Sequence, residues 1–98
     1  MILVRDVFQL KFGKAKEAKA LVKEVVAIQR KLGFASPRLL TDLTGPYYTF
    51  VMELTFQNLA EFEKALKEIM GNPEFGQWYQ KMIPLVDSGR REVYTVVE

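Results

Sequence analysis

One set of polar side chains has the residue types of a small-molecule site. Its members are Arg5, Gln9, Arg38, Tyr47, Thr49 and Glu53. A glutamate can exchange a proton with a substrate, and an arginine can hold an anionic group through two parallel hydrogen bonds. Glu53 is therefore a weak candidate for a catalytic residue, and the candidate ligand contacts of this set are Arg5, Arg38, Tyr47 and Glu53. The favoured alternative is that Arg5 and Glu53 form a structural ion pair that self-association buries.

A second group of candidates is aromatic. Phe75, Trp78, Tyr79 and Met82 recur at the spacing of one helix side. Such a stripe can wall a concave site, and the polar tips of Trp78 and Tyr79 suit the edge of a cavity. Trp78 and Tyr79 are therefore two further ligand-contact candidates, although ordinary packing in a core or an interface explains the same spacing.

The missing residue types exclude several chemistries. The chain has no cysteine and no histidine, so thiolate nucleophiles, cysteine-based metal sites and histidine-ligated haem are excluded. Asp6, Asp42 and Glu53 show no spacing typical of a cation site, and we expect no metal and no cofactor. No apolar run approaches the length of a membrane span, so we expect no membrane partner.

We also expect no nucleic-acid partner. The net charge is only +2, and the lysines of residues 14–32 fall mainly on the solvent side of a predicted helix. Residues 46–53, PYYTFVME, match the third-strand octamer of RNA-recognition motifs only loosely. Pro46 replaces a basic residue, and Glu53 would stand beside the phosphates where that motif needs an aromatic ring.

The elements that position these residues follow from the hydrophobic period. The 98 residues are 49% hydrophobic and 27% charged, which indicates one folded domain spanning residues 1–98. The pattern predicts strands over 2–12, 37–43, 47–56 and 90–97, and helices over 14–32, from Asn58 to Gly71, and 73–82. This order predicts an α+β, ferredoxin-like βαββαβ fold: a four-stranded antiparallel sheet, two main helices on one face and a short extra helix.

Two main helices on one face leave the other face of the sheet without cover. The side chains assigned to this second face are Leu3, Arg5, Val7, Gln9, Tyr47, Thr49, Val51, Glu53, Arg91, Val93 and Val97. So apolar a face marks an interaction surface. We expect a homodimer that stacks two such faces about a two-fold axis. The alternative is a monomer whose own helix over residues 73–82 covers the face.

Three stretches of the chain resemble the dimeric α/β-barrel superfamily, and NIPSNAP-like proteins in particular. VFQLKFGKAKEA (residues 7–18) resembles the first strand and helix start of those proteins, with Phe12 in place of the proline of their turn. VMELTFQNLAEFEKAL (residues 51–66) is similar to their third strand and second helix. WYQKMIPLVDSGRREVYTVV (residues 78–97) is similar to their last helix, turn and strand.

The resemblance implies a dimeric barrel and leaves the activity open. The first expectation is an uncharacterised NIPSNAP-like protein that binds a small molecule in a cleft between sheet and helices. The second is a cofactor-independent monooxygenase-like enzyme acting on an aromatic or enolisable substrate, and the third is a non-catalytic structural or regulatory dimer. Enzymatic members often use a histidine, which this chain lacks. Charge close to the N-terminus, at Arg5 and Asp6, predicts no secretory signal and a place in the cytoplasm.

Overall fold

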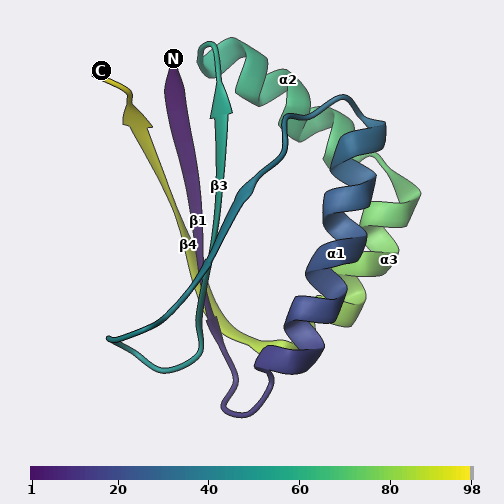
Figure 1. Cartoon of the computed structure of the whole chain (residues 1–98). Coiled ribbons are helices and arrows are strands. Elements are labelled where there is room, and N and C mark those ends of the chain that lie inside the picture. Colours follow the sequence, from purple (N-terminus) through teal and green to yellow (C-terminus); the bar gives the residue numbers. More distant parts are fainter. Residues whose placement is uncertain (98) are drawn as a thin grey trace.

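The computed structural model, which describes residues 1–97, has two layers, with the helices gathered on one side of the strands (Figure 1). The elements are β1 (Ile2–Leu10), α1 (Ala15–Lys31), β2 (Arg38–Thr41), β3 (Thr49–Phe56), α2 (Leu59–Met70), α3 (Pro73–Met82), the 3-10 helix η1 (Ile83–Leu85) and β4 (Val86–Thr95). The strand order is β2-β3-β1-β4, and all neighbours are antiparallel. The predicted ferredoxin-like α+β fold is confirmed.

Asparagine side chains cap the starts of α2 and α3. Asn58 Oδ1 accepts a hydrogen bond from the backbone N–H of Glu61 at 2.9 Å. Asn72 Oδ1 accepts one from the N–H of Phe75 at 3.1 Å. Each side chain satisfies an N–H group that the first helical turn leaves free, which sets where the helix begins.

The last strand begins earlier than predicted. The predicted strand starts at residue 90, but residues 87–89 also lie inside β4, where Gly89 pairs with Phe8. The Phe8 ring lies across Gly89, so that a Cβ atom on this glycine would come within 3.3 Å of the ring. The glycine therefore permits close approach of a neighbouring side chain rather than a reversal of the chain.

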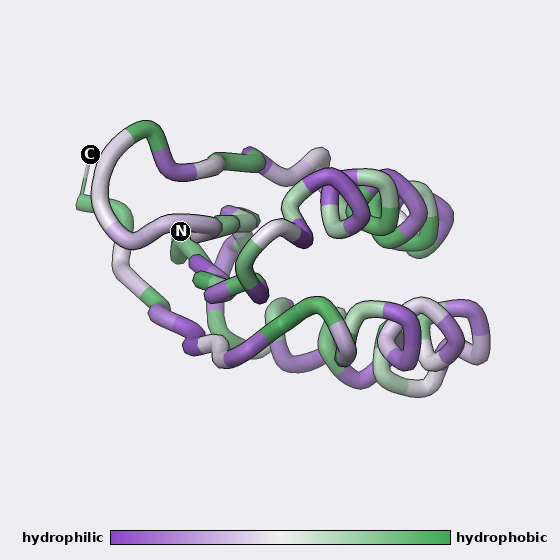
Figure 2. Tube along the Cα trace, turned by 90° about the horizontal axis from the view of Figure 1, so that it is seen from below, coloured by the Kyte–Doolittle hydropathy of each residue, from purple (hydrophilic) through white to green (hydrophobic). Residues whose placement is uncertain are grey.

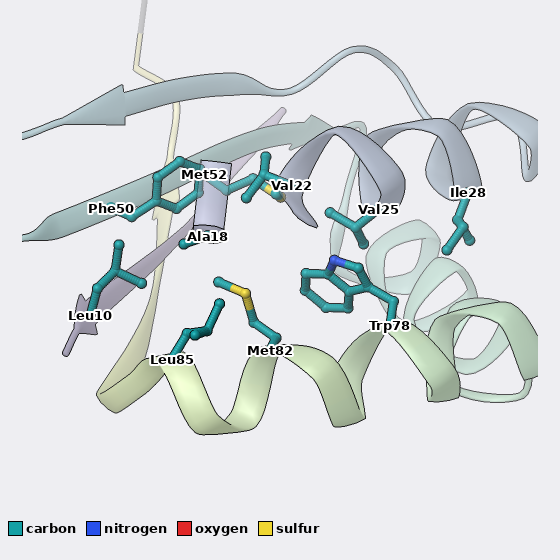
Figure 3. Packing of buried hydrophobic residues seen from close by; sticks show 10 residues of the cluster. All are labelled: Leu10, Ala18, Val22, Val25, Ile28, Phe50, Met52, Trp78, Met82 and Leu85. Carbon is teal, nitrogen blue, oxygen red and sulfur yellow. The ribbon is translucent and has the colours of Figure 1, made fainter. Parts of the chain in front are cut away.

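One core fills the space between the sheet and the helices (Figure 3). Its buried members are Leu10, Ala18, Val22, Val25, Ile28, Phe50, Met52, Trp78, Met82 and Leu85. Trp78 Nε1 donates a hydrogen bond of 2.7 Å to the carbonyl oxygen of Leu21 in α1. The polar atom of the indole is thus satisfied inside apolar surroundings, and the bond ties α3 to α1.

Helix α3 lies on the same side of the sheet as α1. Trp78 and Met82 point from α3 toward Val22 and Val25 of α1 (Figure 3). In the view turned by 90°, the helices again occupy one side and the strands the other (Figure 2). The alternative in which residues 73–82 cover the second face is therefore wrong, and no element within residues 1–97 covers it. We call this second face the open face.

Two residues assigned to the open face lie on the helix side instead. Val93 pairs directly with Val4, and Arg91 pairs with Asp6. Arg91 Nε lies 2.6 Å from Asp6 Oδ1, and the guanidinium lies 5.3 Å from the centroid of the Phe62 ring in α2. The prediction was wrong for both residues because β4 takes its register from β1, and the local sequence does not reveal that register.

Two other predicted members are not part of the sheet. Val97 lies beyond the end of β4, and Tyr47 lies in the loop between β2 and β3. The open face instead carries Leu3, Arg5, Val7, Gln9, Arg38, Leu40, Thr49, Val51, Glu53, Thr55, Arg90, Glu92 and Tyr94. Strand β4 therefore contributes Arg90, Glu92 and Tyr94 to the open face. The sequence had predicted Val93 and Val97 there, so this edge of the face is more polar than expected.

Val25→Ala should lower the free energy of unfolding by about 2 kcal/mol, because the lost methyl groups leave a cavity in the core. The Val25 side chain is only 1% exposed, whereas Val97 is 91% exposed. Val97→Ala is the matched control and should change the free energy of unfolding by less than about 0.5 kcal/mol. Urea unfolding followed by the fluorescence of Trp78 measures both changes. Equal losses in the two variants would contradict the core assignment.

Candidate functional site

Charged side chains form one row across the open face. Arg38 of β2 pairs in register with Glu53 of β3. Arg5 of β1 pairs with Glu53 on one side and with Glu92 of β4 on the other. The sign of the charge therefore alternates from strand to strand, and opposite charges directly across a strand pair are favourable. We call Arg38, Glu53, Arg5 and Glu92 the charge row.

Glu53 is the inner acid of the charge row. Its carboxylate oxygens lie 3.7 Å from Nε of Arg5 and 3.7 Å from Nε of Arg38, and only 12% of its side chain is exposed. Both distances are too long for hydrogen bonds. Arg5 Nε is buried and has no hydrogen-bond partner within residues 1–97. The charges of the row are thus paired, but Arg5 Nε makes no hydrogen bond. A buried polar atom without a hydrogen bond costs stability.

Glu92, at the β4 end of the row, is held by two neighbours on its own strand. Arg90 Nε lies 2.9 Å from Glu92 Oε2, and the hydroxyl of Tyr94 donates to Glu92 Oε1 at 3.0 Å. The hydrogen bond from Arg90, and after it the one from Tyr94, lowers the pKa of Glu92. The same carboxylate raises the pKa of Tyr94, because it accepts the hydrogen bond of the hydroxyl and its negative charge opposes ionisation of the phenol. Glu92 therefore carries a full negative charge at neutral pH.

Apolar side chains flank the charge row. Val7 and Val51 lie beside it on the two central strands, as predicted, and are only 7% and 6% exposed. Neighbouring side chains of the open face already shield them in the single chain. Leu3 and Leu40 are partly exposed. The exposed apolar area of this face is thus smaller than the sequence predicts.

A pocket of about 360 Å³ lies on the helix side, where α1, the end of β1 and the β2–β3 loop (residues 42–48) meet. Its lining residues are Leu10, Phe12, Ala15, Lys19, Thr41, Asp42, Tyr47, Tyr48, Thr49 and Phe50. We call it the loop pocket. The lining is largely apolar, with Lys19 and Asp42 as its charged groups. Size and lining are both typical of sites for small molecules.

Three aromatic rings edge the loop pocket. The ring centroid of Phe12 lies 4.7 Å from that of Tyr48 and 6.4 Å from that of Tyr47, and both pairs meet edge to face. Phe12 and Tyr47 are 78% and 76% exposed. Edge-to-face pairs attract one another and leave ring faces free. The rim of the pocket can therefore stack against a planar ligand.

Tyr48 shapes this rim through an unusual backbone conformation. Its φ of +62° lies in the left-handed region, which bulky residues seldom adopt. Strand β3 consequently begins after it, at Thr49, and not at Tyr47 as predicted. Such strain costs on the order of 1–3 kcal/mol and persists only where surrounding contacts hold it. Here the carbonyl of Tyr48 accepts a hydrogen bond of 2.9 Å from the N–H of Leu10.

Side chains on both sides of the sheet anchor the loop. Gln9, on the open face, donates from Nε2 to the carbonyl of Tyr47, and Thr49 Oγ1 lies 3.3 Å from Gln9 Oε1. Asp42 Oδ1 accepts a hydrogen bond of 3.0 Å from the backbone N–H of Thr49. These hydrogen bonds therefore fix the rim of the loop pocket, and the carboxylate of Asp42 already accepts one of them.

A second hollow, of about 530 Å³, lies near the other end of the sheet, where α1 ends and α2 begins. It contains none of the predicted site residues. Within residues 1–97, no cluster of three or more acidic side chains could hold a metal ion. None of the helices in the same range combines the length and apolar character needed to cross a membrane.

The structure divides the predicted ligand contacts among several places. Arg5, Arg38 and Glu53 come together on the open face, whereas Tyr47 lines the loop pocket on the helix side. Trp78 belongs to the core. Tyr79 is half exposed on α3, with its ring centroid 6.1 Å from that of Phe75. No single site joins these residues within one chain.

Sequence reasoning missed four residues of these two regions. Phe12, Lys19 and Tyr48 line the loop pocket, and Glu92 completes the charge row. An aromatic residue directly before Gly13 in a predicted turn could have marked Phe12 as an exposed ring. Glu92 gave no comparable signal, because its place on the open face depends on the register of β4.

Glu92→Gln should lower the pKa of Tyr94 toward its ordinary value, because the amide is a weaker hydrogen-bond acceptor for the phenol and lacks the negative charge that opposes its ionisation. A raised pKa means that the hydrogen bond of Tyr94 is intact below the pKa of the unfolded chain and is lost as the pH rises through the folded value. An NMR titration of the Tyr94 ring measures the shift. Glu63→Gln, on the exposed side of α2, is the control. An unchanged Tyr94 in Glu92→Gln would contradict this contact.

Comparisons with solved structures agree on the fold. A NIPSNAP family protein from Agrobacterium tumefaciens superimposes with a TM-score of 0.87 at 18% identity, over 96% of this chain and 90% of that chain. An uncharacterized NIPSNAP domain protein from Burkholderia xenovorans gives a TM-score of 0.90 at 13% identity, over 99% and 95%. A putative antibiotic biosynthesis monooxygenase from Nitrosomonas europaea gives 0.78 at 12% identity over 100% of both chains.

No protein-family model and no curated protein matches the chain. Identities this low carry the fold but not the chemistry of a neighbour. The chain therefore has the ferredoxin-like fold of NIPSNAP family proteins, which the putative antibiotic biosynthesis monooxygenase also shares.

Proposed function

We propose that the chain is a small-molecule-binding protein that works as a homodimer, with the loop pocket as its binding site. The observation that carries the proposal is the loop pocket itself, a hollow of about 360 Å³ between sheet and helices. Its aromatic rim is anchored from Gln9 and Asp42. A preformed, mainly apolar cavity with few polar groups is the usual form of a ligand site.

The lining favours an aromatic ligand that carries a negative charge. Phe12 and Tyr47 offer exposed ring faces at the mouth. Lys19 contributes a cation from α1, whereas Asp42 is engaged by the N–H of Thr49. A planar anion can stack on the rings while its charge lies near the ammonium group of Lys19.

The geometry favours binding over catalysis within one chain. Glu53, the candidate for acid–base chemistry, lies on the open face, on the other side of the sheet from the loop pocket. A ligand in the pocket is therefore out of reach of its carboxylate. A monooxygenase-like reaction would use Glu53, Tyr47 or Arg38 as its polar contacts, and of these only Tyr47 lines the pocket.

The open face supports self-association. Helices α1, α2 and α3 pack on the other side of the sheet, so the charge row lies at the surface of a single chain, where the side chains of Arg5 and Arg38 are 39% and 77% exposed. A second copy stacked on this face would cover Leu3 and Leu40 and enclose the charge row. Two-fold stacking of identical faces is the commonest form of a homodimer.

Anilinonaphthalene sulfonate, an aromatic anion, should bind in the loop pocket and gain fluorescence. Tyr47→Ala should weaken its affinity about three- to ten-fold through the loss of one stacking ring. Lys19→Gln should weaken it by a similar factor through the loss of the cation. Tyr79→Ala and Lys23→Gln change exposed residues of the same types outside the pocket and serve as matched controls. Equal losses in test and control variants would contradict the assignment of the pocket.

Light scattering at micromolar concentration should give a mass twice 11.3 kDa. Leu40→Lys should shift the protein to monomer, because it places a further cation in the stacked faces. Leu39→Lys is the matched control: this neighbour in β2 pairs with the core residue Met52 on the helix side and is already 43% exposed. A monomer mass for the unaltered chain would overturn the homodimer and leave the loop pocket to its own test.

A further inference from the structure

We infer that the end of the molecule formed by residues 11–16 and 42–48 docks on the surface of a membrane that carries anionic lipids. We call these two segments the loop end. The inference goes beyond the proposed function and does not depend on what occupies the loop pocket. It rests on two properties that meet at the loop end: large apolar side chains exposed to water, and cations without acidic partners.

Three large apolar side chains project from the loop end. Leu43 is 98% exposed, and Phe12 and Tyr47 are also largely exposed. The rings of Phe12 and Tyr47 meet edge to face with their centroids 6.4 Å apart, so the two segments are in contact. Leucine and aromatic side chains are the types that insert at the boundary between lipid headgroups and acyl chains. The loop end therefore carries the apolar groups of a peripheral membrane contact.

Cations surround these side chains. Lys11 and Lys16 are exposed, and neither forms an ion pair with an acid in the part of the chain that the structure describes. Lys14 pairs with Glu17 just beyond the loop end, at 3.4 Å. Asp42 is the one acid in the two segments, and it already accepts a backbone hydrogen bond. The N-terminus of α1 adds the positive end of its helix dipole, so the loop end attracts anions.

The rest of the fold leaves the loop end free to approach a flat surface. Strand β1 has nine residues, which at about 3.3 Å per residue separate its two ends by about 30 Å. The N–H of Val96 donates to the carbonyl of Met1 at the end of the sheet away from the loop end. Figure 1 shows the β1–α1 turn and the β2–β3 loop at one end of the molecule and the N-terminus at the other. The start of the chain therefore does not obstruct the contact.

Charge and exposed apolar groups together favour a membrane over a soluble polyanion. A lysine near an anionic bilayer strengthens binding about five-fold, and a leucine that leaves water adds about ten-fold. A soluble polyanion would engage the lysines but would leave Leu43 in water. Our expectation of no membrane partner concerns spanning segments, which a peripheral contact does not require.

Sedimentation with lipid vesicles tests the contact. The unaltered chain should bind vesicles of phosphatidylcholine mixed with phosphatidylglycerol more tightly than vesicles of phosphatidylcholine alone, and added salt should reduce the difference. Lys11→Gln with Lys16→Gln should lower the affinity for the anionic vesicles about twenty-fold. Lys64→Gln with Lys67→Gln removes two exposed lysines of α2 and is the matched control, which should bind like the unaltered chain.

A fluorophore at position 43 tests insertion. The chain has no native cysteine, so an introduced thiol is unique. Leu43→Cys labelled with the polarity-sensitive fluorophore nitrobenzoxadiazole should gain fluorescence when anionic vesicles are added. Val97→Cys, at an exposed apolar residue outside the loop end, is the matched control and should not respond. Leu43→Ser should weaken vesicle binding about ten-fold, whereas Val97→Ser should leave it unchanged.

Each outcome supports or overturns the inference. Failure of the unaltered chain to bind anionic vesicles overturns it, and so do equal losses in the loop-end variants and their controls. Binding without a response at position 43 overturns insertion, and its displacement by polyglutamate would then assign the loop end to an acidic protein. Binding to anionic vesicles, weakened by the loop-end variants alone and accompanied by the fluorescence gain, supports it.

These results are separable from the test of the loop pocket. Lys11, Lys16 and Leu43 do not line that pocket, so their variants should bind anilinonaphthalene sulfonate like the unaltered chain. The emission of Trp78, which is buried in the core, shows whether each variant is folded. Failure of the pocket to bind the aromatic anion would overturn the proposed function and leave the membrane contact to its own test.

Discussion

One packing constraint governs the molecule: all three α-helices lie against the same face of the sheet. The contact that completes this arrangement is the docking of α3 on α1, where Trp78 is buried in the shared core and donates its N–H to the carbonyl of Leu21. Because α3 packs against α1 on this face, it cannot also cover the opposite face of the sheet. The open face therefore stays without a helix over it, and Glu53 is nearly buried there between the side chains of Arg5 and Arg38.

Local patterns in the sequence were enough to predict the elements and their order. Asn58 and Asn72 mark two helix starts through side-chain caps, and the alternation of apolar residues identifies the central strands. The register of β4 was beyond such reasoning. Arg91 and Val93 turn to the helix side because they pair with Asp6 and Val4 near the other end of the chain. A one-residue change in register exchanges the two sides of a strand, and no local pattern decides between them.

The candidate site was only partly predictable for the same reason. Arg5 and Glu53 stand in register because the fold makes β1 and β3 neighbours, which the order of elements already implied. The loop pocket depends instead on the backbone of Tyr48, which interrupts an otherwise regular alternation with a left-handed conformation. That conformation is held by a hydrogen bond to Leu10, a contact between distant segments. Sequence periodicity placed Tyr48 in a strand because it carries no information about such a bond.

Gln9 connects the open face of the sheet to the rim of the loop pocket. Its side chain belongs to the open face, yet its amide holds the carbonyl of Tyr47 at the rim of the loop pocket. A partner bound to the open face would lie over the strand whose Gln9 amide holds the rim. In the proposed homodimer, stacking on the open face and binding in the loop pocket would be coupled through this side chain, and such coupling is reciprocal: each event would change the affinity of the other by the same factor.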